Sequence, residues 1–123
     1  MNEVVLLDRR RYVPFALAMA AVVGVSAAAY TSHLPALLGA HGVDKVLHAT
    51  MGMTLTLLLG QALRGRAVLA GLLVMVPLAV DEYLQRFSSA RSSDWADLLA
   101  DVVGVLIAMA VTSALASRRR SAI

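Results

Sequence analysis

The stretch AVLAGLLVMVPLAVDEYLQRF, residues 67 to 87, starts as an unbroken apolar run and then carries two adjacent acids, Asp81 and Glu82. A helix needs roughly 20 mostly apolar residues to cross the hydrocarbon core of a bilayer. The stretch therefore predicts a membrane-spanning helix. A charged side chain in the apolar slab costs about 2.5 to 3.5 kcal/mol on insertion scales, so acids at this place indicate a functional site by default.

Three other apolar runs flank this stretch, at residues 13–30, 43–63 and 95–116. Short links join successive runs, and helices with short links pack as antiparallel neighbours. The chain is 59% hydrophobic, above the usual share of about 45 to 50% in soluble domains. The sequence thus predicts an all-α membrane protein, with residues 1–123 forming one domain that is a four-helix transmembrane bundle.

The basic residues predict how this bundle is oriented. Arginines cluster at 9–11, 64–66 and 118–120, and all three clusters lie on one side if there are four spans. Cytoplasmic flanks of membrane helices are enriched in Lys and Arg. We therefore expect both termini to be cytoplasmic, membrane lipids as partners, and no nucleic acid. The first run also fits the apolar region of a cleaved signal peptide, but its length favours a retained helix.

The predicted topology gathers most of the acids at the opposite ends of the second, third and fourth helices. Basic and amide side chains join them there. The candidate site residues are Asp44, Lys45, His48, Asp81, Glu82, Gln85, Arg91, Asp94, Asp97 and Asp101.

The acids at the starts of helices have an alternative, structural explanation. Asp44 and Asp94 sit where helices begin, and a carboxylate there can cap backbone N–H groups and face the positive end of the dipole. Asp97 keeps part of that benefit. Asp101 lies too deep to cap, so the spacing of Asp94, Asp97 and Asp101 predicts an acidic ladder on one helix face.

The pair Asp81 and Glu82 lies in the last turns of its helix, where the dipole disfavours negative charge. We expect Arg91 to neutralise one of these acids, with Arg86 as the competing partner. Gln85 follows four residues after Asp81 and can share its face.

His48 lies one turn after Asp44 and can meet the same cluster. It could serve packing or proton transfer, because imidazole titrates near neutrality. His48 and the acids could together hold a metal ion, but no H-x-x-x-H or comparable spacing occurs on one helix. We therefore predict no metal site, and no cofactor. Gly104 and Ala108 form a small-x-x-x-small face, which predicts close approach of a neighbouring helix.

Two segments together, DKVLH at 44–48 and DEYLQRFSSARSSDWADLLADVVG at 81–104, resemble the VanZ-like family of small bacterial membrane proteins. The family's motifs are D-K-x-x-H-F, D-E-x-x-Q-x-F-x-P-G-R and D-x-x-D-x-x-x-N-x-x-G. The positions that match are Asp44, Lys45, His48, Asp81, Glu82, Gln85, Phe87, Arg91, Asp94, Asp97 and Gly104. The chain departs from the motifs at Ala49, Ser89, Ala90 and Asp101, of which Asp101 adds a charge where the family has asparagine.

The resemblance implies a multi-pass protein of the bacterial cytoplasmic membrane, and its namesake is associated with resistance to the antibiotic teicoplanin. We expect an outward-facing acidic pocket that binds or acts on a cell-envelope molecule, such as a cell-wall precursor, or a glycopeptide-type antibiotic. Two alternatives stay open: a membrane-embedded acid–base enzyme acting on a lipid-linked substrate, and a structural partner subunit whose polar cluster locks the helices together.

Overall fold

The computed structural model describes residues 9–30, 42–87 and 94–122, and within these ranges the fold is all-α with no strand. Four α-helices follow one another: α2 (Val13–Tyr30), α3 (Val43–Ala62), α4 (Ala67–Leu84) and α5 (Trp95–Ser121). A short 3-10 helix, η2 (Gln85–Phe87), continues α4. The predicted all-α class is therefore confirmed.

The fourth helix extends beyond its predicted end at residue 116. In the structure α5 continues through Arg118, Arg119 and Arg120 to Ser121. Arginine has high helix propensity, and cations in the last turn interact favourably with the negative end of the helix dipole. The cluster expected to follow the helix thus forms its last turns.

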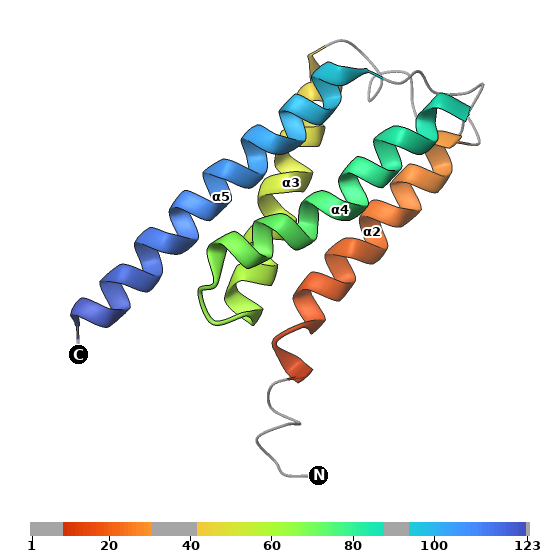
Figure 1. The fold of residues 1–123 in the computed structure, drawn as a ribbon. Coiled ribbons are helices and arrows are strands. Elements are labelled where there is room, and N and C mark those ends of the chain that lie inside the picture. The colour runs from red at the N-terminus through yellow and green to blue at the C-terminus, as the bar shows by residue number, and fades with distance from the viewer. Residues whose placement is uncertain (1–8, 31–41, 88–93, 123) are drawn as a thin grey trace.

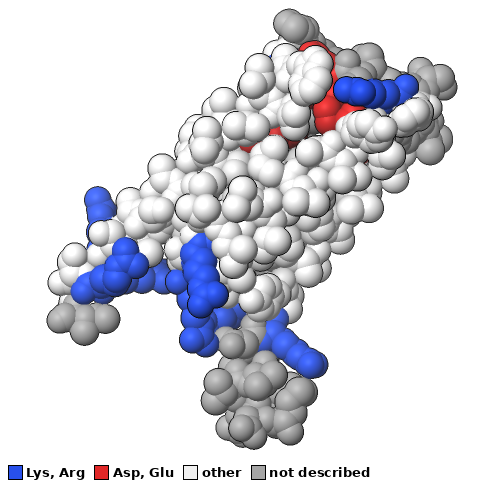
Figure 2. Space-filling view, in the orientation of Figure 1, with Lys and Arg blue, Asp and Glu red and all other residues white. Residues whose placement is uncertain are grey.

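The helices form a bundle with two chemically different ends. The start of α2, the link between α3 and α4 and the end of α5 lie together at one end, here called the arginine end (Figure 1). The opposite end, here called the acidic end, holds the starts of α3 and α5 and the end of α4. Figure 2 shows most of the basic groups at the arginine end, the acids beside a basic group at the other end, and a band without charge between them.

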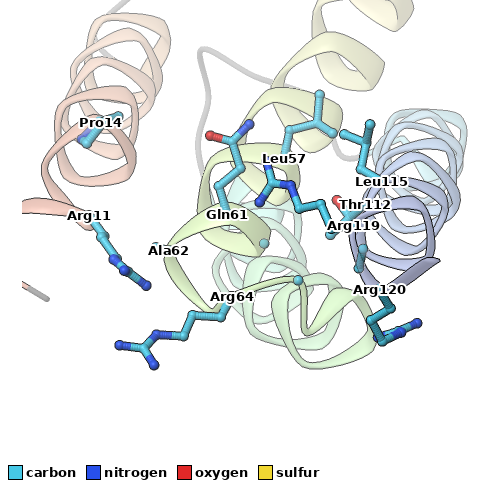
Figure 3. Close-up of a pocket in the computed structure, with 13 residues that line it drawn as sticks. Arg11, Pro14, Leu57, Gln61, Ala62, Arg64, Thr112, Leu115, Arg119 and Arg120 are labelled. Atoms are coloured by element: carbon cyan, nitrogen blue, oxygen red, sulfur yellow. The ribbon is translucent and has the colours of Figure 1, made fainter. Parts of the chain in front are cut away.

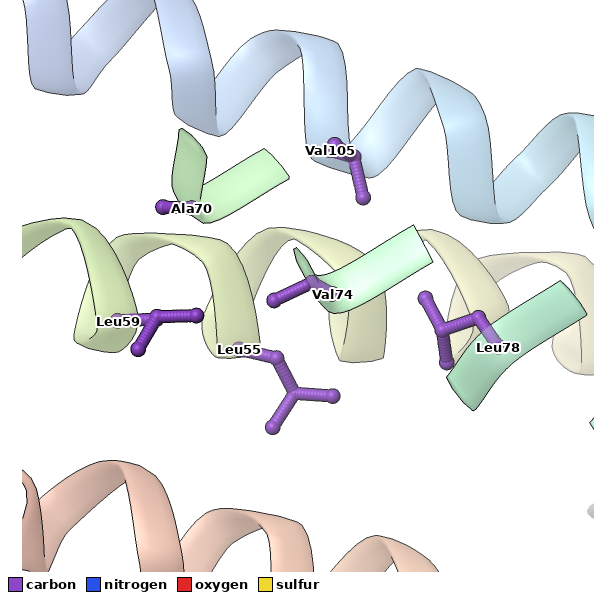
Figure 4. Packing of buried hydrophobic residues seen from close by; sticks show 6 residues of the cluster. All are labelled: Leu55, Leu59, Ala70, Val74, Leu78 and Val105. Carbon is purple, nitrogen blue, oxygen red and sulfur yellow. The ribbon is translucent and has the colours of Figure 1, made fainter. Parts of the chain in front are cut away.

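The apolar core lies between α3, α4 and α5. Its buried side chains come from all three helices, and side chains of α2 such as Phe15 and Val22 pack against it. Figure 4 shows the buried cluster, which consists of Leu55, Leu59, Ala70, Val74, Leu78 and Val105. Contacts with α2, α4 and α5 place α3 at the centre of the bundle.

Backbones of α3 and α5 approach closely, as the small-x-x-x-small pattern predicted. A Cβ atom built on Gly104 would collide with the Ala49 carbonyl oxygen and lie 3.0 Å from the Met53 nitrogen, and Ala108 is fully buried. On the facing helix, a Cβ on Gly52 would lie 2.7 Å from the Asp101 carbonyl oxygen. Small residues on both helices therefore bring the polar groups of α3 within reach of those of α5.

Two helical segments, Ala67–Phe87 and Trp95–Ser121, are long and apolar enough to cross a membrane. Only 33% and 28% of their most apolar windows are buried inside the protein, so most of their apolar side chains face outward. Examples are Val68, Leu72 and Val76 on α4 and Leu106 on α5. The apolar part of α2, Val13–Ala28, is shorter. The helix α3 is more polar than α2 and α4, because it carries residues such as Thr50, Thr54 and Gln61, whose side chains are exposed.

Candidate functional site

At the acidic end, acidic side chains of α3 and α5 converge on His48. The imidazole is 5% exposed, and Asp97 and Asp101 of α5 are 4% and 1% exposed. His48 projects from the second turn of α3, and Asp97 and Asp101 lie four residues apart on the facing side of α5. The Gly52 and Gly104 contacts hold these two helices close enough for the side chains to meet.

The imidazole of His48 is held between acids on both ring nitrogens. Its Nδ1 atom lies 3.0 Å from Asp101 Oδ1. Its Nε2 atom lies 3.6 Å from Asp44 Oδ1 and 3.7 Å from Asp97 Oδ2. An ionised Asp101 accepts the Nδ1–H hydrogen bond, which fixes the ring and directs Nε2 toward the other two acids.

Lys45 forms the second centre of the cluster. Its Nζ atom donates to Asp94 Oδ2 at 2.8 Å and also to Asp97 Oδ1, and it lies 3.7 Å from Asp44 Oδ2. The stacked acids of α5 repel one another, and the basic groups Lys45 and His48 of α3 lie against them and reduce this repulsion.

Of the two acids predicted to cap helices, only Asp94 does so. Asp94 is the N-cap of α5, because its Oδ1 atom accepts a hydrogen bond from the Ala96 nitrogen at 2.9 Å. Asp44 makes no such bond, since Gly42 occupies the cap position of α3. Asp44 therefore interacts with Lys45 and His48 and not with the helix backbone, while Asp94 both caps α5 and binds Lys45.

The last turns of α4 add a second group of polar residues. Glu82 is buried and its Oε1 atom accepts a hydrogen bond from the Asp94 nitrogen at 2.6 Å, which ties α4 to the start of α5. Gln85, also buried, donates from Nε2 to Asp81 Oδ2 at 3.3 Å, as their spacing predicted. Each of the two acids at the negative end of α4 thus accepts a hydrogen bond.

The expected partner of Asp81 or Glu82, Arg91, lies outside the described residues. The competing arginine, Arg86, places its guanidinium carbon 5.3 Å from the centre of the Tyr83 ring. A cation over an aromatic face is a favourable arrangement.

A crevice of about 190 Å³ opens between α4 and α5 beside Glu82. Tyr83, Arg86, Trp95 and Leu98 also line it. Tyr83, Trp95 and Leu98 were not among the site residues predicted from the sequence. The sequence could have indicated Tyr83 and Trp95, because they lie at the end of α4 and the start of α5. Trp and Tyr are enriched where membrane helices meet water.

Three donors at the centre of the cluster could hold a metal ion by their spacing. Ligand atoms of Asp44, His48 and Asp97 all lie within 4.8 Å of one another. Asp44 and His48 lie four residues apart on one face of α3, whereas Asp97 belongs to α5. The spacing of residues along one helix could therefore not predict this combination. Lys45 competes for the Asp97 carboxylate, which makes the arrangement equally suited to an ion-pair network.

The cluster has an exposed rim, formed by Asp44 and Asp94, and a buried floor, formed by His48, Asp97 and Asp101. The side chains of Asp44 and Asp94 are 30% and 46% exposed, whereas His48, Asp97 and Asp101 are buried below them. The rim acids can meet a polar group from outside the bundle. The buried floor can hold a proton, or orient the groups above it.

The chain was compared with known proteins, solved structures and family profiles. No curated protein and no solved structure gave a significant match to the chain. A family profile described as VanZ/LLP1 matches residues 4–116, which include every candidate site residue. Together with two helices able to cross a membrane, this match indicates a membrane protein. The chain belongs to the VanZ/LLP1 family.

Proposed function

We propose that the acidic end is a binding site for the cationic or hydroxyl-rich part of a cell-envelope molecule or a glycopeptide-type antibiotic. The observation that carries the proposal is the convergence of carboxylates from three helices on one site with a half-exposed rim. The described residues of this end include six carboxylates and three basic groups, Lys45, His48 and Arg86. The excess of negative charge favours a cationic ligand group.

The proposed site faces outward from a bacterial cytoplasmic membrane that the four helices cross. The separation of charge supports this orientation, because arginines gather at one end and acids at the other (Figure 2). At 1.5 Å per residue the 18 residues of α4 extend about 27 Å, close to the roughly 30 Å thickness of a hydrocarbon core. The arginine end would then be cytoplasmic, and both termini with it.

In this arrangement a ligand anchored in the outer leaflet would approach through the crevice between α4 and α5. Exposed Tyr83 and Trp95 border that crevice at the level expected for interfacial aromatics. Glu82 lies at its inner side and is bonded to the Asp94 backbone, so the crevice adjoins the rim of the cluster.

Binding to the purified full-length protein in detergent tests the proposal, with teicoplanin and a lipid-linked cell-wall precursor as separate probes. Asp44 is the best residue to change, because it is a half-exposed rim acid without a capping role. We expect Asp44→Asn to weaken binding about tenfold, the equivalent of about 1.4 kcal/mol, and Asp44→Glu to retain most of the affinity. Binding of neither probe, or equal binding to both variants, would contradict the proposal.

A second candidate function, acid–base catalysis on a lipid-linked substrate, draws support from the His48–Asp101 pair at 3.0 Å. A carboxylate that orients an imidazole leaves the other nitrogen able to transfer a proton. His48→Gln would then abolish turnover of the precursor while binding persists. If His48→Gln instead loses the folded bundle and Asp44→Asn changes no binding, the cluster acts as a structural lock.

A further inference from the structure

A second pocket lies at the arginine end, far along the bundle from the candidate site. It has a volume of about 630 Å³, within the range of about 300 to 1,000 Å³ that is usual for small-molecule sites. Residues of α3 and α5 form its walls, and the residues before and at the start of α2 close one side (Figure 3).

Four arginines line this pocket from three parts of the chain. Arg11 precedes α2, Arg64 belongs to the link between α3 and α4, and Arg119 and Arg120 lie in the last turns of α5 (Figure 3). None of the described residues that line the pocket is acidic. The described residues that line this pocket thus carry only positive charge, in contrast to those of the acidic end.

Uncharged lining residues complete a surface suited to a phosphate ester. Gln61 and Thr112 offer an amide and a hydroxyl, and Leu57 and Leu115 offer apolar walls. Leu115 and Val111, four residues apart, are both exposed on α5, so an apolar strip leads from the pocket toward the uncharged band. A polar head and an apolar chain could be bound at the same time.

We propose that this pocket binds the phosphodiester headgroup of an anionic phospholipid, with one acyl chain along the exposed face of α5. Guanidinium groups hold phosphate oxygens through paired, charge-assisted hydrogen bonds. Basic pockets between membrane helices are suited to such headgroups. Both leaflets contain phospholipid, so the site does not depend on the orientation or the ligand proposed for the acidic end.

The test is lipid binding to the full-length protein in detergent micelles, measured by native mass spectrometry with phosphatidylglycerol and, separately, phosphatidylcholine. We expect one phosphatidylglycerol to be retained in preference to phosphatidylcholine. A basic residue near an anionic headgroup contributes roughly 1 kcal/mol, about fivefold in affinity, so Arg119→Ala with Arg120→Ala should weaken binding roughly 20- to 30-fold.

The matched control changes two other arginines of the same end, Arg66→Ala with Arg118→Ala, which remove equal charge but do not line the pocket. This control should bind phosphatidylglycerol like the unaltered protein, and the helical circular dichroism of both double variants should be unchanged. Equal weakening in the two double variants would show diffuse surface attraction and overturn the proposal. Displacement of the lipid by equimolar inorganic phosphate would overturn it as well, because the site would then recognise free phosphate.

Discussion

The two ends of the bundle use charged side chains in opposite ways. At the acidic end, Asp97, Asp101 and His48 point into the bundle and are buried against one another. At the arginine end, Arg66, Arg118 and Arg119 are exposed. A buried charge has lost its hydration, so removing its partner lowers the stability of the protein strongly. An exposed charge keeps its hydration, so removing a neighbouring charge lowers the stability little.

This difference shows what each end can contribute to the protein. The exposed arginines can orient the bundle and attract anionic groups without fixing the positions of the helices. The buried groups at the acidic end fix α3 against α5, and they can do so only because Gly52 and Gly104 let the backbones approach. The comparison predicts that perturbations of equal chemical size have unequal effects at the two ends.

The largest effect is expected from Gly104→Leu. The new side chain has no space, since a Cβ atom there already collides with the Ala49 carbonyl group, and α3 must move away from α5. We expect a loss of about 3 kcal/mol or more in the free energy of unfolding in detergent, followed by circular dichroism. Gly24→Leu is the matched control, because a Cβ at Gly24 meets nothing within 4 Å. Equal stability of the two variants would show that the close contact between α3 and α5 at Gly104 does not stabilise the bundle.

A smaller loss is expected from His48→Ala, which leaves Asp101 buried without its imidazole partner. The free energy of unfolding should fall by about 2 to 3 kcal/mol, the cost of a buried, unsatisfied polar group. Changing both residues to alanine should cost less than the sum of the single changes. Arg118→Ala, at the other end, should stay within about 0.5 kcal/mol of the unaltered protein. Additive effects of the two single changes would mean that the pair is not coupled.

Lys45→Met should have a still smaller effect, about 1 kcal/mol. Lys45 bonds to Asp94 and Asp97, but its side chain is 23% exposed and water screens the interaction in part. Urea unfolding in low and in high salt would measure this loss, which should shrink as salt rises. A loss as large as that of His48→Ala would show that water does not screen the ion pairs of Lys45 more than it screens the buried His48–Asp101 pair.

The smallest effect on stability is expected from two cysteine variants. Labelling of their thiols would show which end of the bundle faces outward. The chain has no cysteine, so Ser89→Cys and Ser121→Cys each introduce a single thiol. We expect an impermeant reagent to label the first in intact cells and the second only after the membrane is opened, since arginine clusters mark the cytoplasmic side. The reverse labelling would turn the acidic end inward and remove an outer-leaflet ligand from consideration.

Much of the architecture was predictable because it depends on local patterns of apolar residues. The apolar runs at 13–30 and 67–87 coincide closely with α2 and with α4 plus η2, and only the last turns of α5 were missed. Arginines 118–120 looked like a flank by composition, yet their helix propensity and their position at the negative end of the dipole continue the helix.

The pairing of side chains was less predictable, because it depends on which helix faces which. Spacing along one helix correctly related Asp81 to Gln85, but it could not show that Lys45 binds Asp94 and Asp97 of α5. Nor could it show that Asp94 caps its helix and Asp44 does not, because that depends on which residue precedes the first turn. In α3 this N-cap residue is Gly42. The expectation for Arg91 stays a prediction.

The sequence by itself determined the family, the helices and the separation of acids from arginines, because each follows from motif positions or from charge and hydropathy along the chain. Only the tertiary structure decided that His48 lies between Asp101 on one ring nitrogen and Asp44 and Asp97 on the other, and that four arginines from separate segments line one pocket. The physical reason is the range of the interactions. Hydropathy and helix propensity act through neighbouring residues, whereas a buried charge is stabilised by partners that helix packing brings from distant parts of the chain.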